Sequence, residues 1–185
     1  MRLIGGVWRG RLLPVVAADG LRPTSDRVRE TLFNWLAPRI AGARCLDLFA
    51  GTGALGFEAV SRGASEAVLI DANKRVAGAL MRTANTFRAG AKIQVRCTDA
   101  LRWLNSTAIT AFDVVFVDPP YASGAAQQVL KYLGEGRLRQ GWLHAGASVY
   151  FETAVNIPLP VFPSCWSLER ECKAGQVRYY LFSTS

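Results

Sequence analysis

The sequence is poor in the residues on which several common catalytic sites depend. It has one histidine, His144, which leaves a His-rich metal site or a hydrolase triad without support. Its four cysteines form no Cys-x-x-Cys pair and indicate neither a zinc site nor a disulfide framework. We expect no metal, and we expect buried, reduced thiols at Cys45, Cys97, Cys165 and Cys172.

Long apolar runs are absent too. A representative run, 112–117, contains Asp113 and is far shorter than the ~20 residues that span a bilayer. The first residues, Met1-Arg2-Leu3, do not begin a signal peptide. With 185 residues, of which 50% are hydrophobic and 19% charged, the chain fits one globular domain. We expect a soluble, cytoplasmic monomer without a membrane partner.

Acidic residues are scarce, and the basic excess is uneven. There are 14 acidic against 22 basic residues, a net charge of +8. Residues 1–44 carry eight arginines and three acids, so this segment alone accounts for +5. Guanidinium groups pair with phosphates and carboxylates through two parallel hydrogen bonds, so the segment favours partners that carry these groups. From charge alone, a nucleic-acid partner and a merely solvated basic surface both stay open. We expect RNA contacts from Arg2, Arg9, Arg11, Arg22, Arg27 and Arg29.

The N-terminal part differs in pattern from the rest. Two short apolar runs, 2–8 and 11–16, flank Arg9-Gly10 and predict a hairpin or extended arm, and Pro14 disfavours a central strand. We therefore divide the chain into a basic hairpin or arm, 1–20, and a main domain, 21–185. Capping residues at 23–26 precede apolar positions at helical spacing, which predict a helix that ends before Pro38.

From residue 44 onward, strand and helix patterns alternate. Strands are predicted over 45–49, 67–70, 93–97, 113–118 and 147–151, and helices over 54–62, 73–88, 100–105 and 125–133. Two last runs, 166–172 and 177–182, predict an antiparallel hairpin at the edge of the sheet. Such alternation is typical of an α/β, Rossmann-like fold with a mostly parallel sheet covered on both faces.

Four carboxylates follow strands that end at one edge of this sheet: Asp47, Asp71, Asp99 and Asp118. Ligands bind α/β sheets beyond the carboxyl ends of the strands, where the strand order reverses. A glycine-rich loop, 49–53, lies among these acids in the sequence. We expect one ligand-binding rim.

The glycine loop alone would also fit a dinucleotide. Gly51-Thr-Gly53-Ala-Leu-Gly56 matches GxGxxG, and Asp71 lies 20 residues after Gly51. Asp47, however, would repel a pyrophosphate and attract an ammonium group. S-adenosylmethionine (SAM) carries an amine, a sulfonium and ribose hydroxyls that Asp71 can bind, and it has no phosphate.

We expect SAM as the cofactor, with close backbone approach at the loop. Two purely structural alternatives stay open. The glycines could serve only helix–strand packing, and Asp99 could only cap a helix instead of contacting adenine. The expected cofactor-binding residues are Thr24, Arg27, Asp47, Phe49, Ala50, Gly51, Thr52, Gly53, Asp71, Ala72, Asp99, Ala100 and Asp118.

The sequence Asp118-Pro119-Pro120-Tyr121 closes the fourth predicted strand and supplies the expected catalytic residues. Two prolines fix the backbone and leave carbonyl oxygens free as acceptors. The exocyclic amine of a base is a weak nucleophile, and a carboxylate and a carbonyl that each accept one N–H can orient it. Tyr121 can stack on a base that has left its helix or loop. The alternative is that the prolines only end a strand.

Together, Asp118-Pro-Pro-Tyr121, Asp47-Leu-Phe-Ala-Gly-Thr-Gly53 and Arg22-Pro-Thr-Ser-Asp-Arg27 resemble the RsmD family, as does Ile4-Gly-Gly-Val-Trp-Arg-Gly10. The similarity runs over essentially the whole chain. It implies a seven-stranded sheet of order 3-2-1-4-5-7-6 and SAM as methyl donor. It also implies methylation of a guanine N2 in 16S rRNA, with the assembled small ribosomal subunit as substrate.

Other functions stay open at this point. The same Asp118 motif suits adenine N6 in RNA or DNA, although a DNA enzyme usually has a further target-recognition domain. Relatives that methylate protein glutamine begin the motif with Asn instead. A noncatalytic RNA-binding assembly factor could also keep this fold, but an intact rim argues against it.

Overall fold

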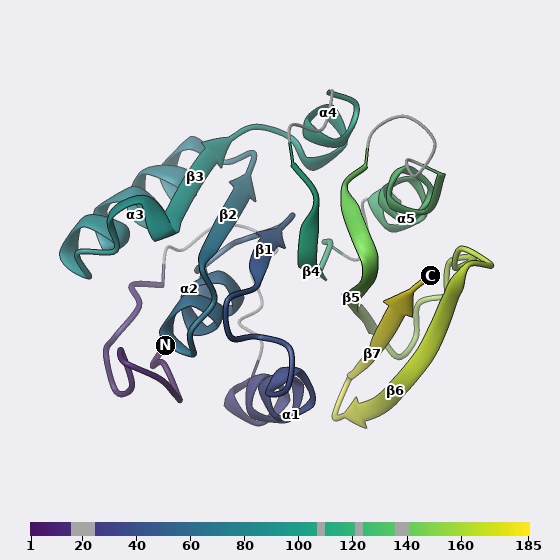
Figure 1. The fold of residues 1–185 in the computed structure, drawn as a ribbon, viewed down its shortest axis with the longest axis horizontal. Helices are drawn as coiled ribbons and strands as arrows, with labels where there is room; N and C mark the ends of the chain where they lie inside the picture. Colours follow the sequence, from purple (N-terminus) through teal and green to yellow (C-terminus); the bar gives the residue numbers. More distant parts are fainter. Residues whose placement is uncertain (16–24, 107–109, 121–123, 136–140) are drawn as a thin grey trace.

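In the computed structural model, described here for residues 1–15, 25–106, 110–120, 124–135 and 141–185, helices surround one seven-stranded sheet (Figure 1). The helices are α1 (Asp26–Leu36), α2 (Ala54–Ser61), α3 (Lys74–Thr86), α4 (Ala100–Leu104) and α5 (Ala125–Glu135), with a 3-10 turn, η1 (Gly90–Lys92). The strands are β1 (Arg44–Asp47), β2 (Glu66–Asp71), β3 (Ile93–Cys97), β4 (Phe112–Val117), β5 (Leu143–Ala154), β6 (Trp166–Ala174) and β7 (Val177–Thr184).

The strand order is β3-β2-β1-β4-β5-β7-β6, which confirms the order that the resemblance implies. Strands β1 to β5 pair in parallel, and β7 joins β5 and β6 in antiparallel pairs. The expected edge hairpin is therefore present, with β6 outermost. Strand β5 is longer at both ends than predicted: Leu143 pairs with Phe112 of β4 at its start, and β7 pairs with it as far as Ala154 at its end.

Alternation along the central strands divides the core into two layers. Side chains on one face of the sheet, such as Leu69 of β2 and Phe116 of β4, pack with α1, α2 and α3. Their neighbours in sequence, Val68 and Val117, lie on the other face and pack with α4 and α5. Figure 1 shows these two groups of helices on opposite sides of the sheet. The near-continuous burial of β2 and β4 is what a parallel sheet covered on both faces requires.

Helix α1 begins where the capping residues predicted it. The Ser25 hydroxyl accepts a hydrogen bond from the Val28 N–H at 3.3 Å, which satisfies one of the free N–H groups of the first turn. Its apolar face is buried through Val28, Leu32 and Leu36. No helix among the described residues is long and apolar enough to cross a membrane.

The N-terminal segment forms a hairpin-like loop that is packed on the main domain. An antiparallel bridge joins Arg2 to Leu12, and Leu3 and Leu13 are buried in the core layer of α1 and α2. The buried carboxylate of Glu58 on α2 accepts hydrogen bonds from the N–H groups of Ile4 and Gly5, at 2.9 and 2.7 Å. The segment is therefore held by buried contacts and is not an extended arm.

Two sequence-based predictions need correction. Arg29, expected to contact RNA, is fully buried, and its Nη2 donates to the Arg2 carbonyl and to Asp26. Burial lowers the pKa of its guanidinium, and its side chain has no exposed surface to offer RNA. The cysteines are free, as expected, but only Cys45 is buried, while Cys97 is exposed because β3 is an edge strand.

Candidate functional site

The rim forms at the point where the strand order reverses. Strand β1 lies between β2 and β4, and the chain after each strand leaves the sheet at the same edge. The Leu48 N–H donates to the Phe116 carbonyl, and the Ala50 N–H donates to the Ile70 carbonyl at 2.9 Å. The loop after β1 is thus tied to both neighbouring strands, as expected for a binding site at a switch point.

The glycine loop is shaped by close packing as well as by its turn. Gly53 has φ +78°, and a Cβ placed there would lie 2.6 Å from a Leu80 methyl group. A Cβ on Gly56 would lie 2.7 Å from Leu69, so this glycine allows α2 to approach β2. Gly51 also has a positive φ, +51°. The alternative that the glycines serve close packing is therefore confirmed at Gly53 and Gly56. This close packing also places backbone N–H groups at the rim.

Asp71 holds the loop in place from the end of β2. Its Oδ2 accepts the Gly51 N–H at 3.0 Å, and its Oδ1 accepts the Asn73 N–H at 2.8 Å. Burial raises the pKa of the Asp71 carboxyl, while these two N–H groups act to lower it. Each carboxylate oxygen has a second lone pair, so the side chain can still accept ligand hydroxyls.

Asp47, the last residue of β1, is almost completely buried. Burial raises the pKa of its carboxyl to about 7, although the N–H groups of Phe49 and Gly56 act to lower it. Its Oδ1 is buried, and none of the described residues supplies it with a hydrogen-bond donor. A buried acceptor without a donor is costly, and a ligand amine would supply that donor.

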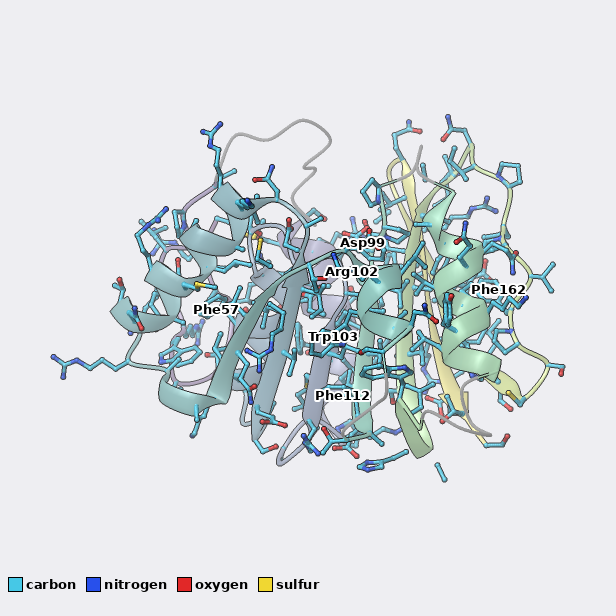
Figure 2. The ribbon with its side chains drawn as sticks, turned by 90° about the horizontal axis from the view of Figure 1, so that it is seen from above. Phe57, Asp99, Arg102, Trp103, Phe112 and Phe162 are labelled. Atoms are coloured by element: carbon cyan, nitrogen blue, oxygen red, sulfur yellow. The ribbon has the colours of Figure 1, made fainter. Side chains whose placement is uncertain are left out.

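Asp99 lies further along the rim and has a structural role. Its Oδ1 accepts the Arg102 N–H at 2.9 Å and caps α4, as the alternative interpretation held. Figure 2 shows Asp99 and Arg102 together at the start of α4, with Trp103 following on the same helix. The Thr98 N–H donates to the Asp71 carbonyl at 3.1 Å, which joins the ends of β2 and β3. An adenine contact by Asp99 stays a prediction.

The remaining expected cofactor residues differ in exposure. Ala72 is exposed and Ala100 is buried, while Phe49 and Thr52 are half-buried on the loop. The Thr52 hydroxyl contacts the Met1 sulfur at 3.7 Å, so the N-terminal residue lies beside the glycine loop. Thr24 and Arg22 fall outside the described residues.

The chain leaves β4 at Asp118, which is half-buried; Pro119 is buried and Pro120 is exposed. The fourth residue of the motif, Tyr121, lies outside the described residues. Because Asp47 is aligned with Phe116 across β1 and β4, Asp118 lies on the sheet edge directly beside the glycine loop. The structure thus brings Asp47, Asp71 and Asp118 to one part of the rim.

Glu152 is a further buried acid at this rim, and the sequence reasoning missed it. Phe151 of β5 pairs with Val117, the last residue of β4. The next residue along each chain segment, Glu152 in β5 and Asp118 just after β4, therefore continues this alignment at the rim. Glu152 accepts a hydrogen bond from the buried Tyr150 hydroxyl. Burial and the negative charges of Glu152 and Asp118 together raise the pKa of Tyr150 well above its usual value. A charge inside the apolar run 147–154 was the available signal.

The arginines expected to contact RNA have different surroundings. Arg27 is exposed on α1, and its charge acts on Tyr179 of β7. Arg9 is exposed, and Arg2 donates to the Gly10 carbonyl at 2.7 Å. Arg11 lies over the Phe87 ring at 3.8 Å, so part of its guanidinium is already engaged.

The described residues hold no cluster of three or more histidine, cysteine or acidic side chains that could bind a metal ion. His144 is exposed, and its Nδ1 lies 2.7 Å from Asp113 at the amino edge of the sheet, opposite the rim. The rim therefore offers carboxylates, a glycine loop and backbone N–H groups. These groups suit an organic cation that also carries hydroxyls.

Comparison with known proteins gives consistent matches over the whole chain. The model of a family described as conserved hypothetical protein 95 matches residues 1–183. The chain is 48% identical over 182 residues to Ribosomal RNA small subunit methyltransferase D of Escherichia coli strain K12, covering 98% of this chain and 89% of that protein. It is 42% identical over 184 residues to the protein of the same name from Haemophilus influenzae strain Rd, covering 98% and 93%.

The fold agrees with a solved relative. The structure described as putative methyltransferase yhhF from Escherichia coli superposes with a TM-score of 0.90 at 45% identity. The match covers 100% of this chain and 97% of that one.

Proposed function

The chain belongs to the RsmD family, the family of conserved hypothetical protein 95, and from that premise we propose a specific reaction. It transfers a methyl group from SAM to the exocyclic N2 amine of a guanine in 16S rRNA, in the assembled small ribosomal subunit. The observation that carries this proposal is the position of Asp118, which ends β4 directly beside the glycine loop of β1. An acceptor amine at Asp118 and a methyl donor at the loop would be adjacent.

The donor side of the rim fits SAM. The Asp47 Oδ1, which has no hydrogen-bond partner among the described residues, would accept a hydrogen bond from the methionyl ammonium group, and Asp71 would accept hydrogen bonds from the ribose hydroxyls while it holds Gly51. Phe49, Thr52 and the loop backbone would line the rest of the donor site. SAM supplies a sulfonium-bound methyl group, an electrophile that is already activated.

The acceptor side would orient the amine. The Asp118 carboxylate and a carbonyl fixed by Pro119 and Pro120 would each accept one N–H of the base, which favours a pyramidal nitrogen with an available lone pair. Asp118 and the carbonyl would hold the nitrogen in line with the methyl group, which SAM would supply as it leaves as a neutral thioether. The surplus N–H proton would pass to the Asp118 carboxylate or to solvent. Alignment of amine and methyl carbon supplies most of the acceleration.

Guanine N2 is favoured over adenine N6 by the family relationship. The relatives reported above are named for the small-subunit ribosomal RNA, and they match 98% of this chain. An adenine-N6 enzyme remains the second candidate, since Asp118 could hold any planar amine. A noncatalytic assembly factor would have no use for both a donor loop and Asp118. We place the protein in the cytoplasm because the small subunit is its substrate. We also propose that it acts as a monomer, and without a metal because the sulfonium of SAM is already activated.

The test is methyl transfer followed by nucleoside analysis. The protein is incubated with methyl-labelled SAM and 16S rRNA or small subunits that lack the modification, and the RNA is digested to nucleosides. Label in N2-methylguanosine supports the proposal. Label in N6-methyladenosine supports the second candidate, and no transfer with either substrate contradicts both.

A further inference from the structure

The segment from Ala72 to Thr98 contains no acidic residue. It carries six basic ones, listed along the chain as Lys74, Arg75, Arg82, Arg88, Lys92 and Arg96. Its net charge is thus +6, whereas residues 99–185 carry seven acids and seven bases. The basic excess of the protein is therefore not confined to the N-terminal segment, since α3 and its flanks hold at least as much.

The side chains of this segment are exposed and have few partners. All six are exposed, and within the described residues only Arg96 makes a side-chain hydrogen bond, to Gln94. For the other five, the described part of the chain supplies neither an ion pair nor a side-chain hydrogen bond. Elsewhere arginines find acids: Arg39 pairs with Glu169 at 2.7 Å, and Arg44 pairs with Glu66 at 2.6 Å. The donors on α3 remain available to an anion outside the chain.

Two of these arginines share one face of α3. Arg75 and Arg82 are seven residues apart, which is about two helical turns and ~10 Å. Gly78 lies between them, and a Cβ placed on it would be 3.5 Å from the Arg82 Nη1. Because Gly78 has no side chain, nothing projects from the helix between the two guanidinium groups at this position. Both groups could therefore contact one extended anionic chain.

This face is continuous with the N-terminal segment. The Arg11 Nη2 donates to the Thr86 carbonyl at the end of α3, at 2.9 Å, and Arg9 beside it is exposed. Figure 1 shows the N-terminal segment on the α2 and α3 side of the sheet. From Lys74, just after the Asp71 end of the rim, to Arg88, the basic face runs for about 20 Å.

We propose that the exposed face of α3, the α3 strip (Lys74, Arg75, Arg82 and Arg88), binds phosphates of ribosomal RNA away from the methylated nucleotide. The inference rests on the proposed function and extends it by locating an RNA-docking surface. An RNA backbone fits this strip because it presents closely spaced phosphates over the whole 20 Å length. A membrane surface fits poorly, because the apolar face of α3 is buried through Val76 and Leu80.

The experiment compares two matched double variants. R75A/R82A removes two charges from the α3 strip, and R170A/K173A removes two exposed charges from the edge strand β6. Binding to unmodified small subunits is measured without SAM across a salt series, so the result does not depend on methyl transfer. SAM affinity and melting temperature are measured for both variants as folding controls.

We expect R75A/R82A to weaken subunit binding by about tenfold at ~0.1 M salt and to reduce the salt slope of log K by roughly 1.4 to 1.8. The R170A/K173A variant should bind like the parent. Equal binding to small subunits and equal salt slopes for all three proteins would overturn the proposal. A parent protein that binds subunits through α3 but transfers no methyl group would instead overturn the proposed function.

Discussion

The Gly51 N–H donates to the Asp71 Oδ2 at 3.0 Å, and this hydrogen bond joins the two halves of the donor site. The same carboxylate also accepts the Asn73 N–H, so it fixes both the loop after β1 and the start of α3. Asp71 thus shapes the loop through these hydrogen bonds. In the proposed function it also accepts the ribose hydroxyls of SAM.

This double role predicts the effect of Asp71→Ala. The substitution removes charge-assisted hydrogen bonds worth roughly 1.5–3 kcal/mol, so SAM affinity should fall by about one to two decades. The melting temperature should fall as well, because the N–H groups of Gly51 and Asn73 lose their acceptor. Calorimetry with SAM and thermal unfolding check the two effects. Unchanged SAM affinity would refute the assignment.

Asp118→Ala should separate catalysis from folding. We expect turnover to fall by a few orders of magnitude, because the acceptor amine loses the group that orients it. SAM affinity and melting temperature should change little, since Asp118 follows the last residue of β4 and is only half-buried. Single-turnover methyl transfer measures the first effect. A variant that methylates normally, or one that does not fold, contradicts the catalytic role.

Asp47 predicts a pH dependence. Its pKa of about 7 in the folded protein exceeds the ordinary value of about 4, so ionising it costs stability, and this cost develops as the pH rises from about 4 to 7. A cationic amine beside Asp47 would lower that pKa again. SAM affinity should therefore increase as the pH rises through 7, with release of a proton on binding, and decrease above about pH 8 as the amine itself loses its charge.

Calorimetry in two buffers with different heats of ionisation counts the released protons. The Asp47→Asn variant should lose the rise in affinity near pH 7. If the SAM affinity of the parent protein does not change with pH near 7, Asp47 does not ionise on binding the SAM amine, and the prediction is wrong.

Glu58 predicts a stability effect at the N-terminal segment. Its carboxylate accepts the N–H groups of Ile4 and Gly5 and the Nε of Arg62, all while fully buried. Glu58→Ala should lower the free energy of unfolding by about 3 kcal/mol or more, since buried donors lose their partner. Trypsin should then cleave after Arg9 and Arg11 faster than in the parent. The exposed Glu30→Ala is the control, and an unchanged cleavage pattern in Glu58→Ala would contradict the prediction.

Most of the fold could be predicted from the sequence, because local signals and global fold agree. The spacing of the apolar residues predicted the succession of strands and helices along the chain. The carboxylates at strand ends predicted the rim that Asp47, Asp71 and Asp118 form. The capping residue Ser25 marked the start of α1. These features depend on residues close together in the sequence.

The errors concern contacts between distant segments. Arg29 and Glu58 lie about 30 and 50 residues from the N-terminal residues they bind, and no local pattern shows that these charges are buried. The exposure of Cys97 follows from β3 being the sheet edge, a position that the strand order implied by the resemblance already contained. The basic face of α3 was missed because charge was summed over residues 45–185 as a whole, where the acids of other segments offset the +6 of residues 72–98.

The central claim is methyl transfer to one guanine of 16S rRNA, and the most direct test is to map the label. Small subunits lacking the modification are incubated with methyl-labelled SAM and the parent protein or Asp118→Ala, beside naked 16S rRNA, and the labelled nucleotide is located. We predict close to one methyl group per subunit, on the N2 of a single guanine, with the parent protein and almost none with Asp118→Ala. Label on adenine, label spread over many nucleotides, or equal transfer by the variant would contradict the account.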